Sequence, residues 1–216
     1  MQKVRLGLSV SLDGFVAGPS QSEDTPLGVG GERLHEWAFA TRSMRALHGM
    51  EGGEEGTDDL WAARHDEQVG ATIMGRNMFG PTRGPWGHPA WGGWWGADPP
   101  FHHPVFVLTH HARASLELGG GTTFHFVTGG IHEALQRARD AAGAADVRIG
   151  GGARTARQFL EAALIDEIHL AIVPVLLGSG ERLFETLPEV GGHYESVEAI
   201  GGERALHVRL IRRVGR

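Results

Sequence analysis

Three segments of this 216-residue sequence place glycine, basic or hydroxyl residues directly after a short apolar run. They are residues 74–78 (MGRNM), residues 105–113 (VFVLTHHAR) and residues 147–155 (VRIGGGART). A glycine lets the backbone come close to a phosphate, and amides that open a helix favour an anion. The three segments therefore indicate a site for a phosphate-bearing ligand, with one segment at the end of each of three predicted strands.

The segment 147–155 carries the clearest of these signals. A strand, the glycines Gly150, Gly151 and Gly152, and then a helix from Ala153 form the arrangement that holds a pyrophosphate at a helix N-terminus. The alternative is a tight strand-to-helix turn with no ligand.

The two other segments are more ambiguous. Thr109, His110 and Arg113 at a strand end suit a phosphate monoester, although a solvated polar loop would have the same composition. Gly75 and Arg76 could bring backbone and a fixed cation to a phosphate, or could form an ordinary turn.

The elements that must position these segments follow from hydrophobic periodicity. Alternating residues predict a first strand over 4–12, and short apolar runs predict strands over 71–74, 105–109, 124–128 and 146–149. Helical patterns cover 131–138 and 156–163, a long strand interrupted by Pro174 follows over 167–177, and a hairpin joins 194–200 to 204–212. This order predicts one α/β domain over residues 1–216, with a mostly parallel central sheet flanked by helices and an antiparallel C-terminal hairpin.

Two stretches between the first and second strands are less regular. An apolar stripe over 34–47 fits a helix, and Thr57 is predicted to cap a second helix that runs to Val69 and is closed by Gly70. Residues 80–104 are rich in glycine, proline and tryptophan, which predicts a long loop.

Composition excludes several classes of function. The net charge of −6 lacks the basic footprint of a nucleic-acid binder, and no apolar stretch is long enough to span a membrane. Lys3 is the only lysine, which rules out a Walker A motif, and there is no cysteine. Adjacent histidines on a strand point to opposite faces, so we expect no metal site. We expect a cytoplasmic protein.

A Rossmann domain is the obvious rival interpretation, but its glycine fingerprint should follow the first strand and open a helix. Here the first strand leads to Asp13 and Gly14. The later segment 28–33 (GVGGER) lacks the third glycine and has no strand before it, which argues against that fold.

Five sequence blocks instead resemble a known family. They are residues 11–17 (SLDGFVA), 73–79 (IMGRNMF), 149–152 (IGGG), 164–168 (LIDEI) and 174–180 (PVLLGSG), in the family's order. They are similar to the reductase domain at the C-terminus of the bifunctional riboflavin-biosynthesis deaminase-reductase. The resemblance covers most of the chain and implies a dihydrofolate-reductase-like fold and NADPH as cofactor. We expect a stand-alone member of this superfamily.

The resemblance also implies a role for each matching position. It places residues near the nicotinamide (Ser9, Val16, Ala17), at the phosphates and adenosine (Gly75, Arg76, Asn77, Met78), near the adenosine 2′-phosphate (Thr109, His110) and at the pyrophosphate (Gly150, Gly151, Gly152, Ala153).

The expected activity is hydride transfer from NADPH to a small heterocyclic or carbonyl substrate, similar to a riboflavin precursor or a pterin. Asp13 is the candidate catalytic acid, although bonding backbone amides at the strand end is an equal alternative. Two other functions stay open: a nucleotide-sensing module without turnover, and a true dihydrofolate reductase, which would need a carboxylate such as Glu32 or Glu36. Because related domains pair through the long strand and the hairpin, we expect a homodimer.

Overall fold

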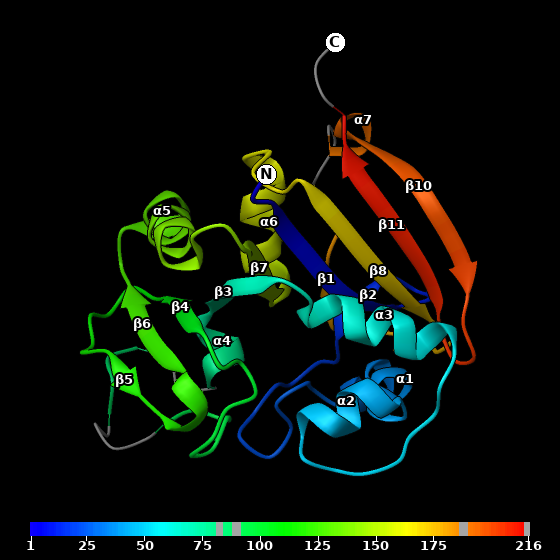
Figure 1. The fold of residues 1–216 in the computed structure, drawn as a ribbon, viewed down its shortest axis with the longest axis horizontal. Coiled ribbons are helices and arrows are strands. Elements are labelled where there is room, and N and C mark those ends of the chain that lie inside the picture. The colour runs from blue at the N-terminus through cyan, green and yellow to red at the C-terminus, as the bar shows by residue number, and fades with distance from the viewer. Residues whose placement is uncertain (81–83, 88–91, 186–189, 214–216) are drawn as a thin grey trace.

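A single large sheet organises the chain. The computed structural model describes all residues except 81–83, 88–91, 186–189 and 214–216. Within this described part, nine strands form one sheet in the order β10-β11-β8-β1-β7-β3-β4-β6-β5, and β2 pairs separately with β9 (Figure 1). The strands are β1 (Val4–Ser11), β2 (Phe15–Ala17), β3 (Val69–Gly75), β4 (Pro104–Leu108), β5 (Leu116–Glu117), β6 (Thr123–Val127), β7 (Asp146–Gly151), β8 (Glu167–Val173), β9 (Glu181–Arg182), β10 (Tyr194–Gly201) and β11 (Leu206–Arg212).

The centre of the sheet is parallel and its edges are antiparallel. Strands β8, β1, β7, β3, β4 and β6 run in one direction, whereas β11, β10 and β5 pair in the antiparallel sense. The helices are α1 (Glu36–Phe39), α2 (Arg42–Leu47), α3 (Thr57–Asp66), α4 (Arg76–Phe79), α5 (Gly130–Ala142), α6 (Ala153–Glu161) and α7 (Val190–His193), with short 3-10 helices η1 (Gly31–Leu34) and η2 (Gly119–Gly121).

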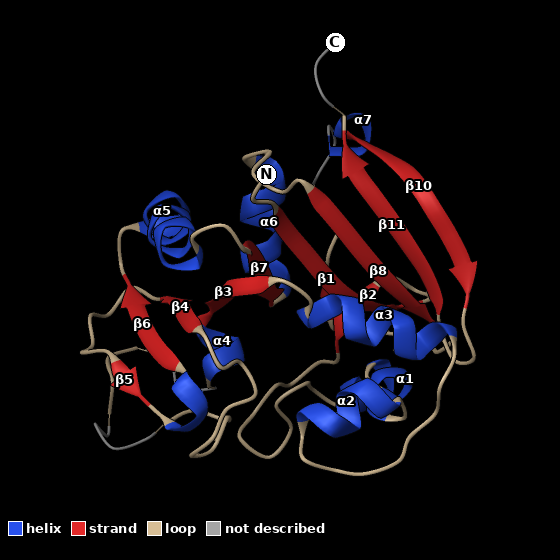
Figure 2. Ribbon diagram, viewed as in Figure 1, coloured by secondary structure: helices blue, strands red, loops and turns tan. Residues whose placement is uncertain are grey.

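The two faces of the sheet are covered by different helices (Figure 2). On one face, α5 and α6 pack against alternate residues of the central strands; this core includes Leu6, Ile73 and Ile168. On the opposite face, α1 and α3 pack on Ala171 and Val173 of β8, while α4 and the loop before β4 cover β3, β4 and β6. Parallel strands buried on both faces account for the nearly continuous apolar runs in the sequence.

This architecture confirms the predicted fold class: an α/β chain with a mostly parallel central sheet, flanking helices and an antiparallel C-terminal hairpin. Two boundaries differ from prediction. Strand β8 ends at Val173, just before Pro174, rather than at residue 177. Strand β7 continues through Gly150 to Gly151, so two of the three glycines belong to the strand.

The predicted helix over 34–47 is wrong, because the structure breaks it into η1, α1 and α2. Thr41 causes the last break: its extended backbone caps α2, and its side chain accepts a hydrogen bond from the Met44 N–H. The backbone of Thr41 also bridges to Glu54. Tertiary pairing therefore overrides a stripe that a single helix would satisfy.

The predicted ends of the next helix are also wrong. Gly56 is the N-cap of α3, and the Thr57 N–H is held by the Glu203 carboxylate 3.1 Å away. The helix ends at Asp66, where the Arg5 guanidinium of β1 donates to the carbonyls of Arg64 and Glu67. Gly70 lies inside β3, where a side chain would come within 2.9 Å of the α5 backbone. It permits close packing and does not end a helix.

Among the described residues, no helix combines the length and apolar character that crossing a bilayer would require.

Candidate functional site

The three ligand-type segments meet at one edge of the sheet. Strands β7, β3 and β4 are neighbours and parallel, with Met74 opposite Gly151 and Gly75 opposite Leu108. Because parallel strands all end at the same edge, the turns that follow β7, β3 and β4 lie side by side there. Ligands of open α/β sheets bind outside this carboxyl edge.

The start of α6 is open at this edge. Gly152, the N-cap residue, is exposed, and no side chain caps the helix. A Cβ built on Gly152 would meet no atom within 4 Å, so free space lies beside the amides of the first turn, which begins at Ala153. Uncapped amides of this kind favour an anion.

The glycines behind this opening allow close packing between elements. A Cβ on Gly150 would lie 3.3 Å from the Met78 sulfur, and Gly151 has a φ of 115°, which favours glycine. A Cβ on Gly75 would overlap Thr155 Oγ1 of α6. The starts of α4 and α6 are therefore in contact, as a ligand that bridges them would need.

The Trp-rich loop forms a wall over α4. The indole N–H of Trp94 donates to the Asn77 carbonyl and that of Trp95 to the Met78 carbonyl, both at 3.2 Å. The Arg76 guanidinium donates to the Gly84 carbonyl and lies 3.7 Å from the Trp86 ring centroid. Arg76 therefore packs against this loop, so its contact with a phosphate stays a prediction.

The turn after β4 is held by Thr109 and by Trp86 of the Trp-rich loop. The buried Thr109 hydroxyl accepts a hydrogen bond from the His111 N–H at 3.2 Å, while the Trp86 indole donates to the His111 carbonyl at 2.8 Å. His110 is exposed at this turn. Thr109 stabilises the turn, and His110 is the side chain that faces outward beside the opening.

The residues predicted near the nicotinamide lie on β1 and β2. The Ser9 hydroxyl accepts a hydrogen bond from the Trp37 indole of α1 at 2.9 Å. Val16 and Ala17 are buried in β2, whose partner strand is β9. The contact of these three residues with a cofactor stays a prediction.

Asp13 does not suit the role of catalytic acid. Its carboxylate accepts hydrogen bonds from the Ser11 hydroxyl at 2.6 Å and the Gly178 N–H at 2.6 Å, and it is also bonded by the Leu177 N–H. The Ser11 hydrogen bond, followed by these backbone amides, lowers the pKa of Asp13 to about 2. At neutral pH this carboxyl has no proton to give. Its role is to join the β1–β2 turn to the segment after β8.

Sequence reasoning missed a buried polar chain under α3. The Asp58 carboxylate accepts from His207 Nε2 at 2.7 Å, and His207 Nδ1 lies 3.0 Å from His169 Nε2. Trp61 stacks on the His169 ring with centroids 4.4 Å apart. Strand parity alone could not reveal this chain, because the pairing of β8 with β11 brings His169 and His207 together.

The adjacent histidines do not come together with other potential metal ligands in the part of the chain that the structure describes. Within the residues that the structure describes, no group of three or more histidine, aspartate or glutamate side chains could hold a metal ion.

The strand order and the helices on both faces of the sheet give the chain a dihydrofolate-reductase-like α/β fold. The RibD C-terminal domain family matches residues 2–203, and the chain belongs to this family. No curated protein sequence matches the chain.

Solved structures share the fold at low sequence identity. A Shewanella sp. PV-4 protein, provisionally described as a riboflavin biosynthesis protein, has a TM-score of 0.59 and 20% identity, covering 99% of this chain and 100% of that one. Enterococcus faecalis dihydrofolate reductase, complexed with NADP(H) and RAB-propyl, has a TM-score of 0.53 and 12% identity over 98% of this chain and 97% of its own. Acinetobacter baumannii RibD has a TM-score of 0.53 and 17% identity, and this chain spans 59% of its length.

Proposed function

We propose that this protein is an NADPH-dependent reductase that acts on a small heterocyclic or carbonyl compound, similar to a riboflavin precursor or a pterin. Membership of the RibD C-terminal domain family supports a reductase role. The observation that carries the proposal is the meeting of the β3, β4 and β7 ends beside the uncapped start of α6.

The residues at this edge fit a dinucleotide phosphate. The space beside Gly152 would admit a pyrophosphate, whose oxygens would accept hydrogen bonds from the first amides of α6. Arg154, exposed in the first turn, adds a cation beside that space. Ser9, Val16 and Ala17 would contact the nicotinamide end, and Thr109 with His110 the 2′-phosphate end.

When bound, NADPH would supply the hydride, and the protein would supply orientation and exclude water. Two segments could exclude water from the bound cofactor. The Trp-rich loop contacts α4, which follows β3, and α1 contacts Ser9 of β1, so the two lie on either side of β7. Because Asp13 is ionised, we propose that the proton consumed in the reduction comes from solvent.

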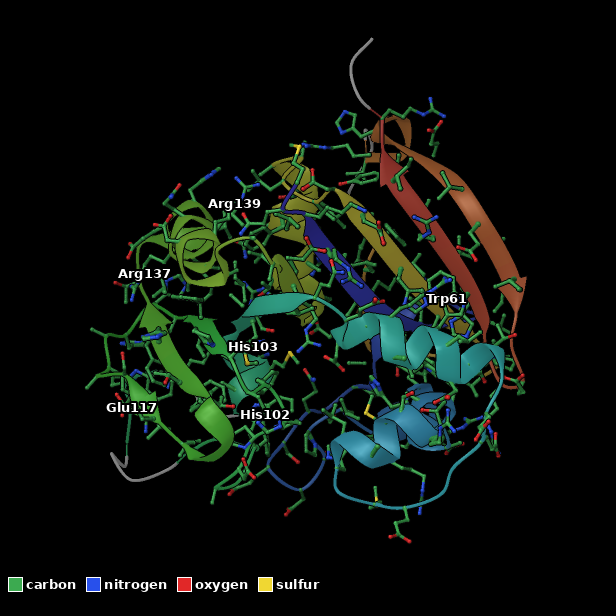
Figure 3. All side chains as sticks on the ribbon, viewed as in Figure 1. Trp61, His102, His103, Glu117, Arg137 and Arg139 are labelled. Atoms are coloured by element: carbon green, nitrogen blue, oxygen red, sulfur yellow. The ribbon has the colours of Figure 1, made fainter. Side chains whose placement is uncertain are left out.

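Charge reversal at Arg154 tests the proposal. Arg154→Glu places a carboxylate beside the pyrophosphate, and losing one charge-assisted contact of about 1.5–3 kcal/mol weakens binding by at least about tenfold. Arg139→Glu is the matched control, because Arg139 lies in the last turn of α5, which leads to the amino end of β7 (Figure 3). Calorimetric titration with NADPH should detect binding to the parent and to Arg139→Glu with equal affinity. Equal binding to all three proteins would place the cofactor elsewhere.

Turnover separates the proposal from its two rivals. The loss of NADPH absorbance is followed with a panel of pterins, pyrimidines and quinones. Tight NADPH binding without turnover on any compound would favour a nucleotide-sensing module. Turnover confined to dihydrofolate would favour a true dihydrofolate reductase, although Glu32 and Glu36, its candidate carboxylates, are both exposed.

We also propose that the chain forms a homodimer through the C-terminal hairpin. Strand β8 is enclosed between β1 and β11, so it offers no free edge, whereas β10 is the edge strand of the sheet. Val197, Ile200 and Leu206 expose apolar side chains on this hairpin, which supports its use as a contact surface.

A further inference from the structure

A cavity lies at the opposite edge of the sheet from the proposed cofactor site. It measures about 310 Å³ and is lined by the first residues of three strands, among them Arg5 of β1, Asp146 of β7 and Glu167 of β8. Gly7 lines it from the sheet, and Trp61 and His65 of α3 form its other wall (Figure 3 labels Trp61). Parallel strands begin at one edge and end at the other, so this amino-edge cavity is separate from the turns that end β3, β4 and β7.

Four carboxylates line the amino-edge cavity; those of Glu167, Glu198 and Asp146 have cationic or N–H partners, and the fourth belongs to the exposed Glu67. Glu167 lies 3.0 Å from Lys3 Nζ and 3.6 Å from Arg209. Glu198 lies 3.3 Å from Arg209 and 3.7 Å from Arg64.

Asp146 accepts the Lys3 backbone N–H at 2.7 Å and faces Arg5 at 3.6 Å. Each guanidinium carries five N–H donors and these carboxylates use only some of them. The wall therefore holds N–H donors that these carboxylates do not use.

Arg148 is the buried member of this donor set. It is 6% exposed and lines the amino-edge cavity from β7. One of its terminal nitrogens pairs with Asp66 at the end of α3, while its Nε has no hydrogen-bond partner among the described residues. Buried donors in proteins are nearly always satisfied, so an arginine left in this state indicates a missing acceptor.

The histidines of the amino-edge cavity contribute no positive charge near neutral pH. Burial lowers the pKa of His65 to about 4 and that of His169 to about 3. The Asp58 carboxylate accepts from His207 Nε2, so His207 Nδ1 is the acceptor for His169 Nε2–H. This chain holds the neutral His169 ring in place beneath Trp61. The positive charge that a ligand would meet is therefore that of the arginines.

We propose that the amino-edge cavity binds a small oxyanion, a phosphate or carboxylate group, against the guanidinium of Arg148. A planar guanidinium suits two oxygens of such a group, and arginine is favoured for this recognition. The site is independent of the proposed reductase activity, because none of its lining residues belongs to the carboxyl edge.

Calorimetric titration of the full chain with inorganic phosphate, at an ionic strength kept constant with chloride, tests this assignment. The parent should bind phosphate, and it should do so equally in the presence of saturating NADPH. Arg148→Lys keeps a cation beside Asp66 but loses the planar fork, so phosphate should bind at least about tenfold more weakly. Arg137→Met is the control, because it removes one cation from the far face, where Arg137 pairs with Glu133 of α5.

A second measurement needs no change at Arg148. The Trp61 indole resonance, assigned by its loss in Trp61→Phe, should shift as phosphate is added to the parent. Three results would overturn the proposal: no heat and no shift in the parent, equal phosphate affinity in Arg148→Lys, or displacement of phosphate by NADPH. The last result would place the anion at the cofactor edge.

Discussion

Replacing Gly75 by alanine probes the contact between α4 and α6 that shapes the proposed cofactor edge. Gly75 has φ −77° and ψ 158°, a conformation that alanine adopts without strain. The added Cβ, however, would lie closer than 3.0 Å to Thr155 Oγ1, while Thr155 Cβ stays 3.6 Å away. The cost of Gly75→Ala is therefore steric and is due to one oxygen atom.

The expected magnitude follows from this geometry. Forcing an extra methyl into a packed contact costs about 1–3 kcal/mol, and each kcal/mol lowers the Tm of a chain of this size by about 2–4 °C. Thr155→Ala removes Oγ1 and leaves an ordinary van der Waals contact. The double variant should therefore recover much of the loss, with a coupling free energy of about 1–2 kcal/mol.

Urea and thermal unfolding of the parent, both single variants and the double variant measure this coupling. Gly201→Ala is the control, because its Cβ would meet no atom within 4 Å and its stability should stay near that of the parent. Additive losses, with no recovery in the double variant, would refute the packing of α4 against α6 described above.

Three other predictions concern pH, the buried polar chain and association. Burial lowers the pKa of His35 and His65 to about 4, so only the unfolded chain takes up their protons between about pH 6.5 and pH 4. The free energy of unfolding should therefore decrease as the pH is lowered through that window, by up to about 3 kcal/mol for each imidazole. A free energy of unfolding in urea that stays constant between pH 7 and pH 5 would contradict this. Asp58→Ala leaves the buried Nε2–H of the neutral His207 ring without its acceptor and should cost about 1–3 kcal/mol in the same assay, whereas the exposed Asp24→Ala should cost almost nothing. Sedimentation at micromolar concentration should show a homodimer, and a single species near 23.2 kDa would count against the hairpin contact.

Local patterns in the sequence determined the class of fold. The alternation in residues 4–12 and the short apolar runs before Gly75, Thr109 and Gly150 depend on nearest neighbours, so they predicted the strands that converge on the proposed site. The resemblance of the same blocks to the RibD C-terminal domain family, confirmed by the match over residues 2–203, has the same local origin. The glycines that let the backbone come close to a ligand or to another element could be recognised in the sequence, because only glycine lacks a Cβ atom.

Only the tertiary structure decided features that depend on residues far apart in the chain. Arg5 ends α3 from a neighbouring strand, and Thr41 breaks a helix because it bridges to Glu54. The Asp13 carboxylate is held by the neighbouring Ser11 hydroxyl and also by amides at residues 177–178, far along the chain, which make it a tertiary link between two turns. Strand order likewise brings Arg148 and His169 to one cavity. The type of each side chain and the hydrophobic period of each element are local properties of the sequence. The hydrogen-bond partners of a side chain also depend on the strand that the sheet places beside it, and these partners shift its pKa.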